Sequence, residues 1–274
     1  MAALSTLPAP HLSSLTSSVL SQTLHHHHRL SSILSSPSLF SLTLHHLHSL
    51  SLPNKSLLIA KHLHSSLHLL TRHFQYASPQ GPLPPCPSST KPRDLDAALL
   101  LLLLCNIHQE NPETLKAPRS KWREGLCRHY ADTVLTLSSG IGVHYGGVLL
   151  PYIERTVRCW RFVGLMGGCG GKERREVAAA PAAVVALPTV EVEAGGGGGR
   201  DHCCAICKEE MRVGRDVCEL PCEHLFHWMC ILPWLRKRNT CPCCRFQLPT
   251  DDVFAEIQRL WGVVAKVGGG SPTG

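Results

Sequence analysis

The sequence predicts a small zinc-stabilised α+β module near the C-terminus, preceded by a mostly helical and partly low-complexity region. Two observations carry this prediction. Eight cysteines and histidines lie at metal-ligand spacing between Cys204 and Cys244, and apolar residues recur at helical steps across residues 1–166. The segment that holds the ligands is too short for its few apolar side chains to maintain a fold by themselves, so bound metal must stabilise it.

Residues 1–93 are rich in leucine, serine and histidine and contain no aspartate or glutamate. Prolines divide this segment into short predicted helices, of which the clearest follows Asn54, a residue that can cap it. Twelve of the eighteen histidines lie here, and we interpret them as polar faces of helices rather than as metal ligands. The helix after Asn54 has one apolar stripe, formed by Ile59, Leu63, Leu67, Leu70 and Phe74.

The run of leucines after Ala97 looks at first like a membrane anchor. It has nine apolar residues before Asn106, whereas a bilayer span needs about 20, so we predict a buried helix. Further helices are predicted from Ser120 and from about Val148 to Met166. We assign residues 1–166 to targeting or to substrate recruitment.

Residues 167–200 are dominated by glycine, alanine, valine and proline, with five consecutive glycines from Gly195 to Gly199. Because ordering a glycine-rich chain costs much conformational entropy, we predict a flexible linker to a zinc module at 201–249. Residues 250–274 are predicted to form a capped helix over Asp251 to Trp261 and a disordered tail.

The candidate zinc ligands form two knuckles and a central group. Two cysteines separated by two residues can reach one Zn²⁺ from a single tight turn, and such a pair lies at each end of the segment. The four ligands between the pairs are too compressed to be anything but ligands shared between two sites, so the sites interleave. In chain order the ligands are Cys204, Cys207, Cys222, His224, His227, Cys230, Cys241 and Cys244.

Adjacent thiols leave the register of both knuckles open, because Cys203 or Cys243 can also ligate. Four protein ligands on each metal leave no position for an activated water, so the zinc ions are structural and hydrolysis at zinc is not expected. Thiols clustered at metal spacing without a secretory leader favour a reducing compartment.

The order of three cysteines, two histidines and three cysteines resembles the RING-H2 ubiquitin ligases. The likeness extends to Ile206, Pro233-Trp234-Leu235, Pro242 and Arg245, and the residues flanking the last knuckle favour Cys244 as its second ligand. The resemblance implies a small α+β RING module with a two-zinc cross-brace. Its ligand sets would be Cys204, Cys207, His227 and Cys230 on one zinc, and Cys222, His224, Cys241 and Cys244 on the other.

The resemblance also implies an E3 ligase that binds a ubiquitin-charged conjugating enzyme (E2) and promotes direct transfer of ubiquitin to a substrate lysine. The family's E2-binding positions match Ile206, Trp234, Leu235 and Pro242, and its linchpin, which donates hydrogen bonds to E2 and ubiquitin, matches Arg245. Since no cysteine is a credible nucleophile, catalysis is by positioning, without a covalent ubiquitin intermediate. The alternative is a non-enzymatic, zinc-stabilised interaction scaffold.

The net charge of +7 does not argue for nucleic acid. Six of the basic residues precede Asp94, the first acidic residue, and the remaining 21 nearly balance the 20 acidic residues. A nucleic-acid-binding module would concentrate its basic residues on the folded domain, so we expect no nucleic-acid partner.

The leucine-, histidine- and serine-rich N-terminus, together with residues 230–261, resembles plant RING-H2 ligases associated with amyloplasts and shoot gravitropism. By composition residues 1–93 also suit a plastid transit peptide, although import would place the RING where the ubiquitin system is absent. We therefore expect a cytosol-facing protein, peripherally attached to a plastid surface without a transmembrane segment, and otherwise a cytoplasmic or nuclear one.

Overall fold

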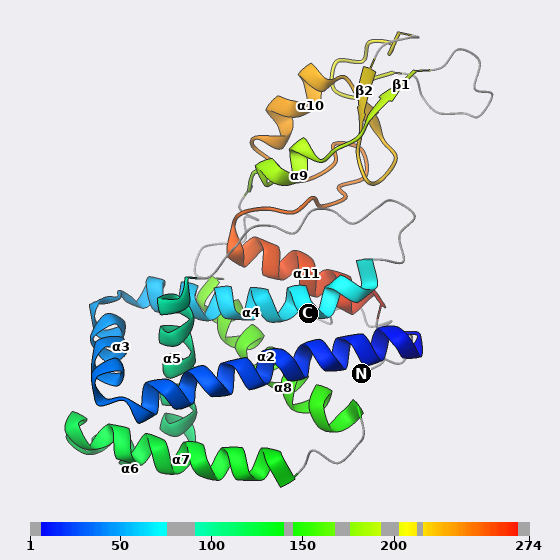
Figure 1. Cartoon of the computed structure of the whole chain (residues 1–274). Coiled ribbons are helices and arrows are strands. Elements are labelled where there is room, and N and C mark those ends of the chain that lie inside the picture. Colours follow the sequence, from blue (N-terminus) through cyan, green and yellow to red (C-terminus); the bar gives the residue numbers. More distant parts are fainter. Residues whose placement is uncertain are drawn as a thin grey trace. The chain divides into compact units, whose positions relative to one another are not determined.

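The computed structural model describes residues 7–75, 91–139, 145–167, 176–192, 203–212 and 216–267. The chain divides into two compact units (Figure 1). The helical unit comprises Met1–Phe74, Ser89–Cys169 and Val263–Gly274, and the zinc unit comprises Gln75–Ser88 and Gly170–Gly262.

Prolines and short polar residues set the starts of several helices in the helical unit. In α3 the hydroxyl oxygen of Ser36 accepts a hydrogen bond from the backbone N–H of Leu39 at 3.3 Å, and Pro37 follows as the first helical residue. The predicted cap at Asn54 is wrong, because α4 begins at Leu52 and takes Pro53 into its first turn. The helices are α2 (Ala9–Ser35), α3 (Pro37–Ser49), α4 (Leu52–Gln75), α5 (Pro92–Glu110), α6 (Glu113–Lys116), α7 (Arg119–Ser139) and α8 (Tyr145–Gly167).

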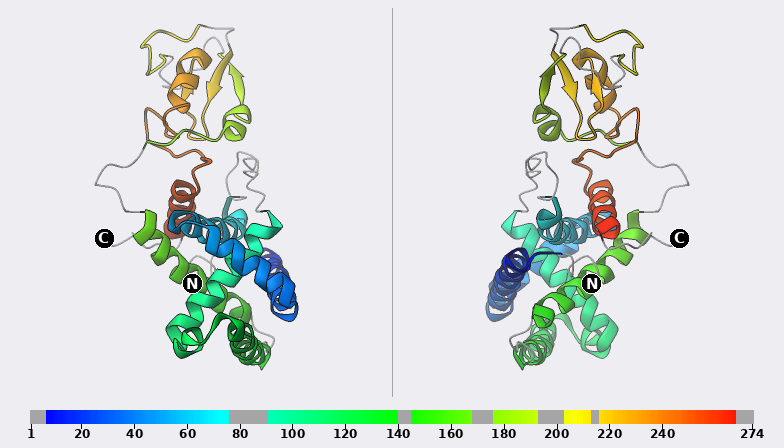
Figure 2. Two further views of the ribbon diagram at one scale, coloured as in Figure 1. Left: turned by 90° about the vertical axis from the view of Figure 1, so that its left-hand side faces the viewer. Right: turned by 90° about the vertical axis from the view of Figure 1, so that its right-hand side faces the viewer.

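The leucine run forms the buried helix α5, as its length predicts. Ala97, Leu100 and Ile107 are fully buried, and α5 packs against α2, α3 and α7, which can be followed in Figure 1 and in the turned views of Figure 2. Within the described residues, no helix is both long enough and apolar enough to cross a membrane.

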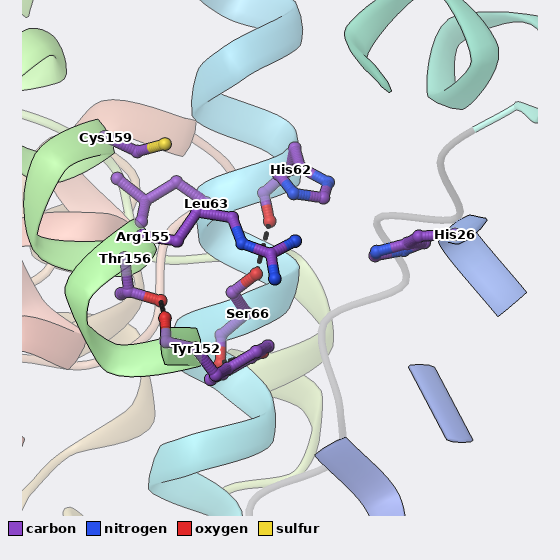
Figure 3. Close-up of a pocket in the computed structure, with 8 residues that line it drawn as sticks. All are labelled: His26, His62, Leu63, Ser66, Tyr152, Arg155, Thr156 and Cys159. Atoms are coloured by element: carbon purple, nitrogen blue, oxygen red, sulfur yellow. Dashed lines mark hydrogen bonds between the residues drawn. The ribbon is translucent and has the colours of Figure 1, made fainter. Parts of the chain in front are cut away.

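A cavity between α2, α4 and α8 contains two of the histidines (Figure 3). Its volume is about 10 Å³, roughly that of one water molecule, which excludes a small-molecule ligand. The ring centroids of His26 and His62 are 5.0 Å apart, and Arg155 also lines the cavity. The interpretation of the histidines as polar faces is therefore wrong for His62 and His64, which are buried among the helices.

The zinc unit contains a three-stranded antiparallel sheet in the order β1-β2-β3. Val190 of β1 pairs with Val217 of β2, and Cys218 of β2 pairs with Phe226 of β3. Helix α10 packs against β2, and the core between them includes Phe226, Ile231 and Leu235. The elements are α9 (Pro181–Val185), β1 (Thr189–Glu191), β2 (Asp216–Glu219), β3 (Leu225–Phe226) and α10 (Trp228–Leu235).

Part of the predicted linker is an integral part of the zinc unit. Residues 176–192, which we call the N-terminal extension, form α9 and β1, and Ala179, Leu187 and Val192 are buried in the core of the unit. The prediction of a flexible linker is wrong for this stretch because alanine, valine and leucine provide enough apolar surface to offset the entropy of ordering. The rest of 167–200, including the five glycines, lies outside the described residues apart from Gly167, the last residue of α8.

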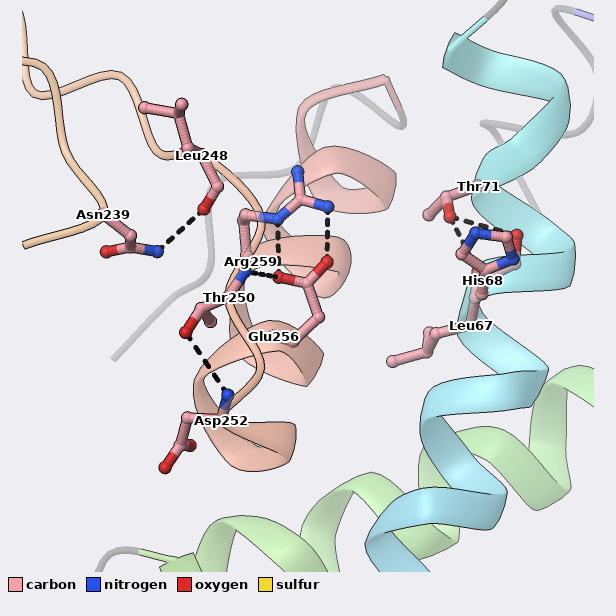
Figure 4. Close-up of polar contacts among 9 residues, drawn as sticks. All are labelled: Leu67, His68, Thr71, Asn239, Leu248, Thr250, Asp252, Glu256 and Arg259. Atoms are coloured by element: carbon pink, nitrogen blue, oxygen red, sulfur yellow. Dashed lines mark hydrogen bonds and ion pairs between the residues drawn. The ribbon is translucent and has the colours of Figure 1, made fainter. Parts of the chain in front are cut away.

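The helix after the zinc module, α11 (Val253–Val267), is longer than predicted and begins in a network of hydrogen bonds (Figure 4). Asp252 caps it, since its carboxylate accepts the backbone N–H of Ala255 at 2.9 Å. The buried carboxylate of Glu256 accepts hydrogen bonds from the Thr250 backbone N–H at 3.1 Å and from Arg259 at 2.6 and 2.9 Å. Residues 268–274, predicted to be a disordered tail, lie outside the described residues.

Candidate metal centres and the surface around them

Cys204 and Cys207 project from a tight knuckle that the backbone stabilises. The N–H of Lys208 donates to the Cys204 carbonyl at 2.7 Å, and the Cys204 N–H donates to the Glu209 carbonyl at 2.9 Å. Lys208 adopts a left-handed conformation with φ 61°. This turn brings both thiols to the same side of the loop, which is the arrangement that a shared metal requires.

The second knuckle repeats this geometry around Cys241 and Cys244. The N–H of Arg245 donates to the Cys241 carbonyl at 3.0 Å, the Cys241 N–H donates to the Phe246 carbonyl at 2.8 Å, and Arg245 also has φ 61°.

The central ligands come from the β2–β3 hairpin and from the start of α10. A tight turn at Glu223, with φ 64°, places Cys222 and His224 side by side. His227 precedes α10, and the N–H of Cys230 donates to the His227 carbonyl at 3.0 Å, so one helical turn presents both side chains in the same direction.

The eight candidate ligands meet in two clusters of four. Within each cluster every ligand atom lies within 4.8 Å of the others. Nδ1 of His227 lies 3.4 Å from Sγ of Cys207, and Nδ1 of His224 lies 3.4 Å from Sγ of Cys222. One cluster contains Cys204, Cys207, His227 and Cys230, and the other contains Cys222, His224, Cys241 and Cys244.

Both clusters fit zinc, which takes thiolate and imidazole ligands in a tetrahedron. The pKa of the Cys222 thiol is raised to about 12 by burial and by the neighbouring thiols of Cys244 and Cys241, which outweigh a backbone hydrogen bond at His224 that lowers it. Such crowding of thiols is unfavourable unless a cation binds them as thiolates. The protein therefore holds two structural zinc ions, and Cys203 and Cys243 belong to neither cluster.

Three of the four predicted E2-contact residues lie at the surface beside these clusters. Ile206 and Pro242 are the half-buried residues inside the two knuckles, and Trp234 is half-buried near the end of α10. Leu235 differs, because it is only 1 % exposed and packs in the core. The prediction that Leu235 contacts a partner is wrong, since helical spacing turns the residue after Trp234 inward.

The side chain of Trp234 is fixed by contacts that sequence reasoning missed. Its indole N–H donates to the Thr240 carbonyl at 2.7 Å, and the Arg238 guanidinium carbon lies 4.8 Å from the ring centroid. Arg238 also forms an ion pair with Glu176 in the N-terminal extension. Only the spacing of Trp234 and Arg238 on one helical turn hinted at this contact, because the partner Glu176 lies far away in sequence.

The comparisons with known proteins agree with this geometry. The ring finger domain family matches residues 202–245. The Arabidopsis thaliana protein named E3 ubiquitin-protein ligase SGR9, amyloplastic, is 54% identical over 273 residues, which cover 97% of this chain and 94% of the relative. The chain belongs to the RING-H2 E3 ubiquitin ligases.

Other E3 ligases match a shorter part of the chain. The Arabidopsis E3 ubiquitin-protein ligase RING1-like is 49% identical over 74 residues, covering 27% of this chain and 23% of the relative. The Mus musculus E3 ubiquitin-protein ligase RNF181 is 47% identical over 74 residues, covering 27% of this chain and 43% of the relative. As a RING ligase, the protein engages an E2 and a protein substrate and promotes ubiquitin transfer between them.

Proposed function

We propose that Ile206, Trp234 and Pro242 form the E2 contact of this ligase. The observation that carries the proposal is that the two metal clusters present one apolar residue from each knuckle, while α10 adds a fixed indole. A few large apolar groups at the centre of a small interface carry most of its binding energy. Ile206 and Trp234 pack against the core of the zinc unit, so the contact surface rests on a rigid base.

Arg245 is the proposed linchpin that bridges E2 and ubiquitin. Its side chain is exposed immediately after the second knuckle, and its backbone is anchored to Cys241. A planar guanidinium can donate hydrogen bonds to two acceptors at once, which suits a group that must hold E2 and ubiquitin together. Restricting ubiquitin to one orientation lets a substrate lysine attack the thioester, and this catalysis needs no acid or base from the ligase.

The helical unit, in this proposal, recruits the substrate and holds the ligase at the cytosolic face of a plastid. The printed name of the full-length Arabidopsis relative, amyloplastic, supports the location. The absence of acidic residues before Asp94 supports contact with an anionic surface, because no carboxylate in α2, α3 or α4 would oppose it. Attachment at the cytosolic face keeps the RING in the compartment that contains E2 enzymes.

A discharge assay with a panel of ubiquitin-charged E2 enzymes tests the E2 contact. Trp234→Ala should abolish stimulated discharge while two zinc ions per chain remain bound, and Val185→Ala, at an exposed site on α9, should leave it unchanged. Retention of full activity by Trp234→Ala would contradict the proposal.

Fluorescent tags at the two ends of the chain test the location. Both tags should stay on one polypeptide at the plastid periphery, accessible to protease added to intact plastids. A cleaved N-terminal tag with the C-terminal tag inside the stroma would contradict attachment at the cytosolic face.

A further inference from the structure

The N-terminal extension reaches the proposed E2 contact through a chain of three side chains. The carboxylate of Glu176 pairs with the guanidinium of Arg238, and this guanidinium lies over the indole of Trp234 at 4.8 Å from the ring centroid. On its edge the indole is held by the hydrogen bond to the Thr240 carbonyl. The indole therefore has a ring-face contact and an edge contact, both supplied by its own chain.

The backbone holds Arg238 in the position that this contact requires. The N–H of Arg238 donates to the Trp234 carbonyl at 2.9 Å, so the two residues are locked one helical turn apart. The next residue, Asn239, is buried, and its side-chain amide donates to the Leu248 carbonyl at 2.8 Å (Figure 4). The base of the Arg238 side chain is thus fixed, and the remaining freedom lies in its long exposed stem.

Glu176 removes much of that freedom. The backbone of the extension is anchored close by, since Ala179 donates to the Leu235 carbonyl at 2.9 Å and Ala180 donates to the Pro249 carbonyl at 2.8 Å. A carboxylate held in this way keeps the guanidinium over the ring, where the negative face of the indole attracts it.

We propose that Glu176 and Arg238 are positioning residues for ubiquitin transfer: they hold the Trp234 indole in the orientation that E2 meets and cover one of its faces. This inference rests on the proposed role of Trp234 in the E2 contact. With one face covered by the guanidinium, E2 meets the part of the ring that the guanidinium and the core leave exposed. Glu176 thereby becomes part of the E2-binding site, although it lies outside the 202–245 match to the ring finger family.

The positioning role of Glu176 and Arg238 predicts a defined change in the kinetics of ubiquitin discharge. Glu176→Gln and Arg238→Ala should each raise the KM for ubiquitin-charged E2 about two- to fivefold, the size expected for an exposed ion pair and a cation–π contact. The rate of discharge at saturating E2 should not change, because neither residue reaches the thioester.

Matched variants separate positioning from a simple loss of charge. Glu191→Gln removes the same charge from the same extension at an exposed site in β1, and should leave the KM unchanged. The exchange Glu176→Arg with Arg238→Glu restores an ion pair but places no cation on the indole, so it should not restore the KM. Recovery of the wild-type KM in the exchanged protein would overturn the inference.

A spectroscopic readout checks the orientation directly in the full-length zinc-bound protein. The indole ¹H–¹⁵N resonance of Trp234, assigned by its loss in Trp234→Phe, should shift in Glu176→Gln and Arg238→Ala but not in Glu191→Gln. This inference alone would be overturned if Trp234→Ala abolishes discharge while Glu176→Gln and Arg238→Ala shift neither the indole resonance nor the KM. Full discharge by Trp234→Ala would instead overturn the proposed E2 contact and this inference with it.

Discussion

Lys208 and Arg245 occupy equivalent positions in the two zinc knuckles. Each follows the second cysteine of its knuckle, each has φ 61°, and each donates its N–H to the carbonyl of the first cysteine, at 2.7 and 3.0 Å. The left-handed conformation disfavours most side chains but suits glycine. Glycine at either position therefore removes the side chain without disturbing the knuckle, which makes the pair a matched experiment.

Arg245→Gly should lower the rate of E2 discharge about ten- to hundredfold, because charge-assisted hydrogen bonds from the guanidinium are lost. Lys208→Gly makes the same backbone change in the other knuckle and should retain activity. Zinc content and E2 affinity are measured in both variants. Equal activity of the two variants would show that Arg245 does not bridge E2 and ubiquitin.

Leu187→Ala should destabilise the zinc unit by about 2–4 kcal/mol, because Leu187 is 7 % exposed and lies in the core that the extension shares with the sheet. Val185 is 86 % exposed in the same extension, so Val185→Ala should not change the stability of the zinc unit measurably. Chelator-induced unfolding followed by circular dichroism compares the two. Indistinguishable unfolding curves would mean that residues 176–192 are only a tether.

Glu256→Ala should destabilise the start of α11 by about 2–4 kcal/mol. The substitution leaves the half-buried Arg259 without its carboxylate and the Thr250 N–H without its acceptor. Hydrogen exchange of the Thr250 and Ala255 amides measures the effect locally, and Gln258→Ala on the exposed face of the helix is the control. If the Thr250 and Ala255 amides of Glu256→Ala exchange as slowly as those of the wild type, the hydrogen bonds of Glu256 do not stabilise the start of α11.

Acidification should destabilise the helical unit through His62. Burial, and then the charge of Arg155 on α8, lower its pKa from 6.5 to about 4, while burial and His62 lower the pKa of His26 on α2 to about 3. The unfolded chain therefore binds protons that the folded chain does not. Stability is complete above pH 6.5 and falls by about 1 kcal/mol per pH unit toward pH 4.

Thermal unfolding of wild type and His62→Gln between pH 7 and 5 checks this dependence. Both proteins carry the same zinc sites, so acid effects on the metal cancel in the comparison. His62→Gln should show a shallower loss of melting temperature, and equal slopes in the two proteins would contradict the assignment.

The zinc-binding segment could be predicted from the sequence because its ligands lie at short, fixed spacings along the chain. Zinc coordination imposes fixed spacings on Cys204, Cys207, Cys241 and Cys244, and these spacings are visible in a linear chain. The buried leucine helix could likewise be predicted, since nine apolar residues are too few for a bilayer and enough for a core.

The extension could not be predicted in the same way, because what orders it is distant in sequence. Alanine and valine between glycine-rich stretches indicate a flexible chain as long as the core partners of Ala179 and Leu187, such as Leu235 and Leu248, are not known. The contact of Arg238 with Glu176 could not be predicted either, because the two residues lie far apart in the sequence. The family position of Leu235 predicts a surface contact, although its place on α10 turns this residue into the core.

The interleaving of the two ligand sets also constrains biosynthesis. As the nascent chain leaves the ribosome, the first set is complete once Cys230 has emerged, whereas the second set waits for Cys244 while Cys222 and His224 are already exposed. The ligands of the first zinc therefore become available before those of the second, and the last residues to join the second site are those that carry Arg245 into place.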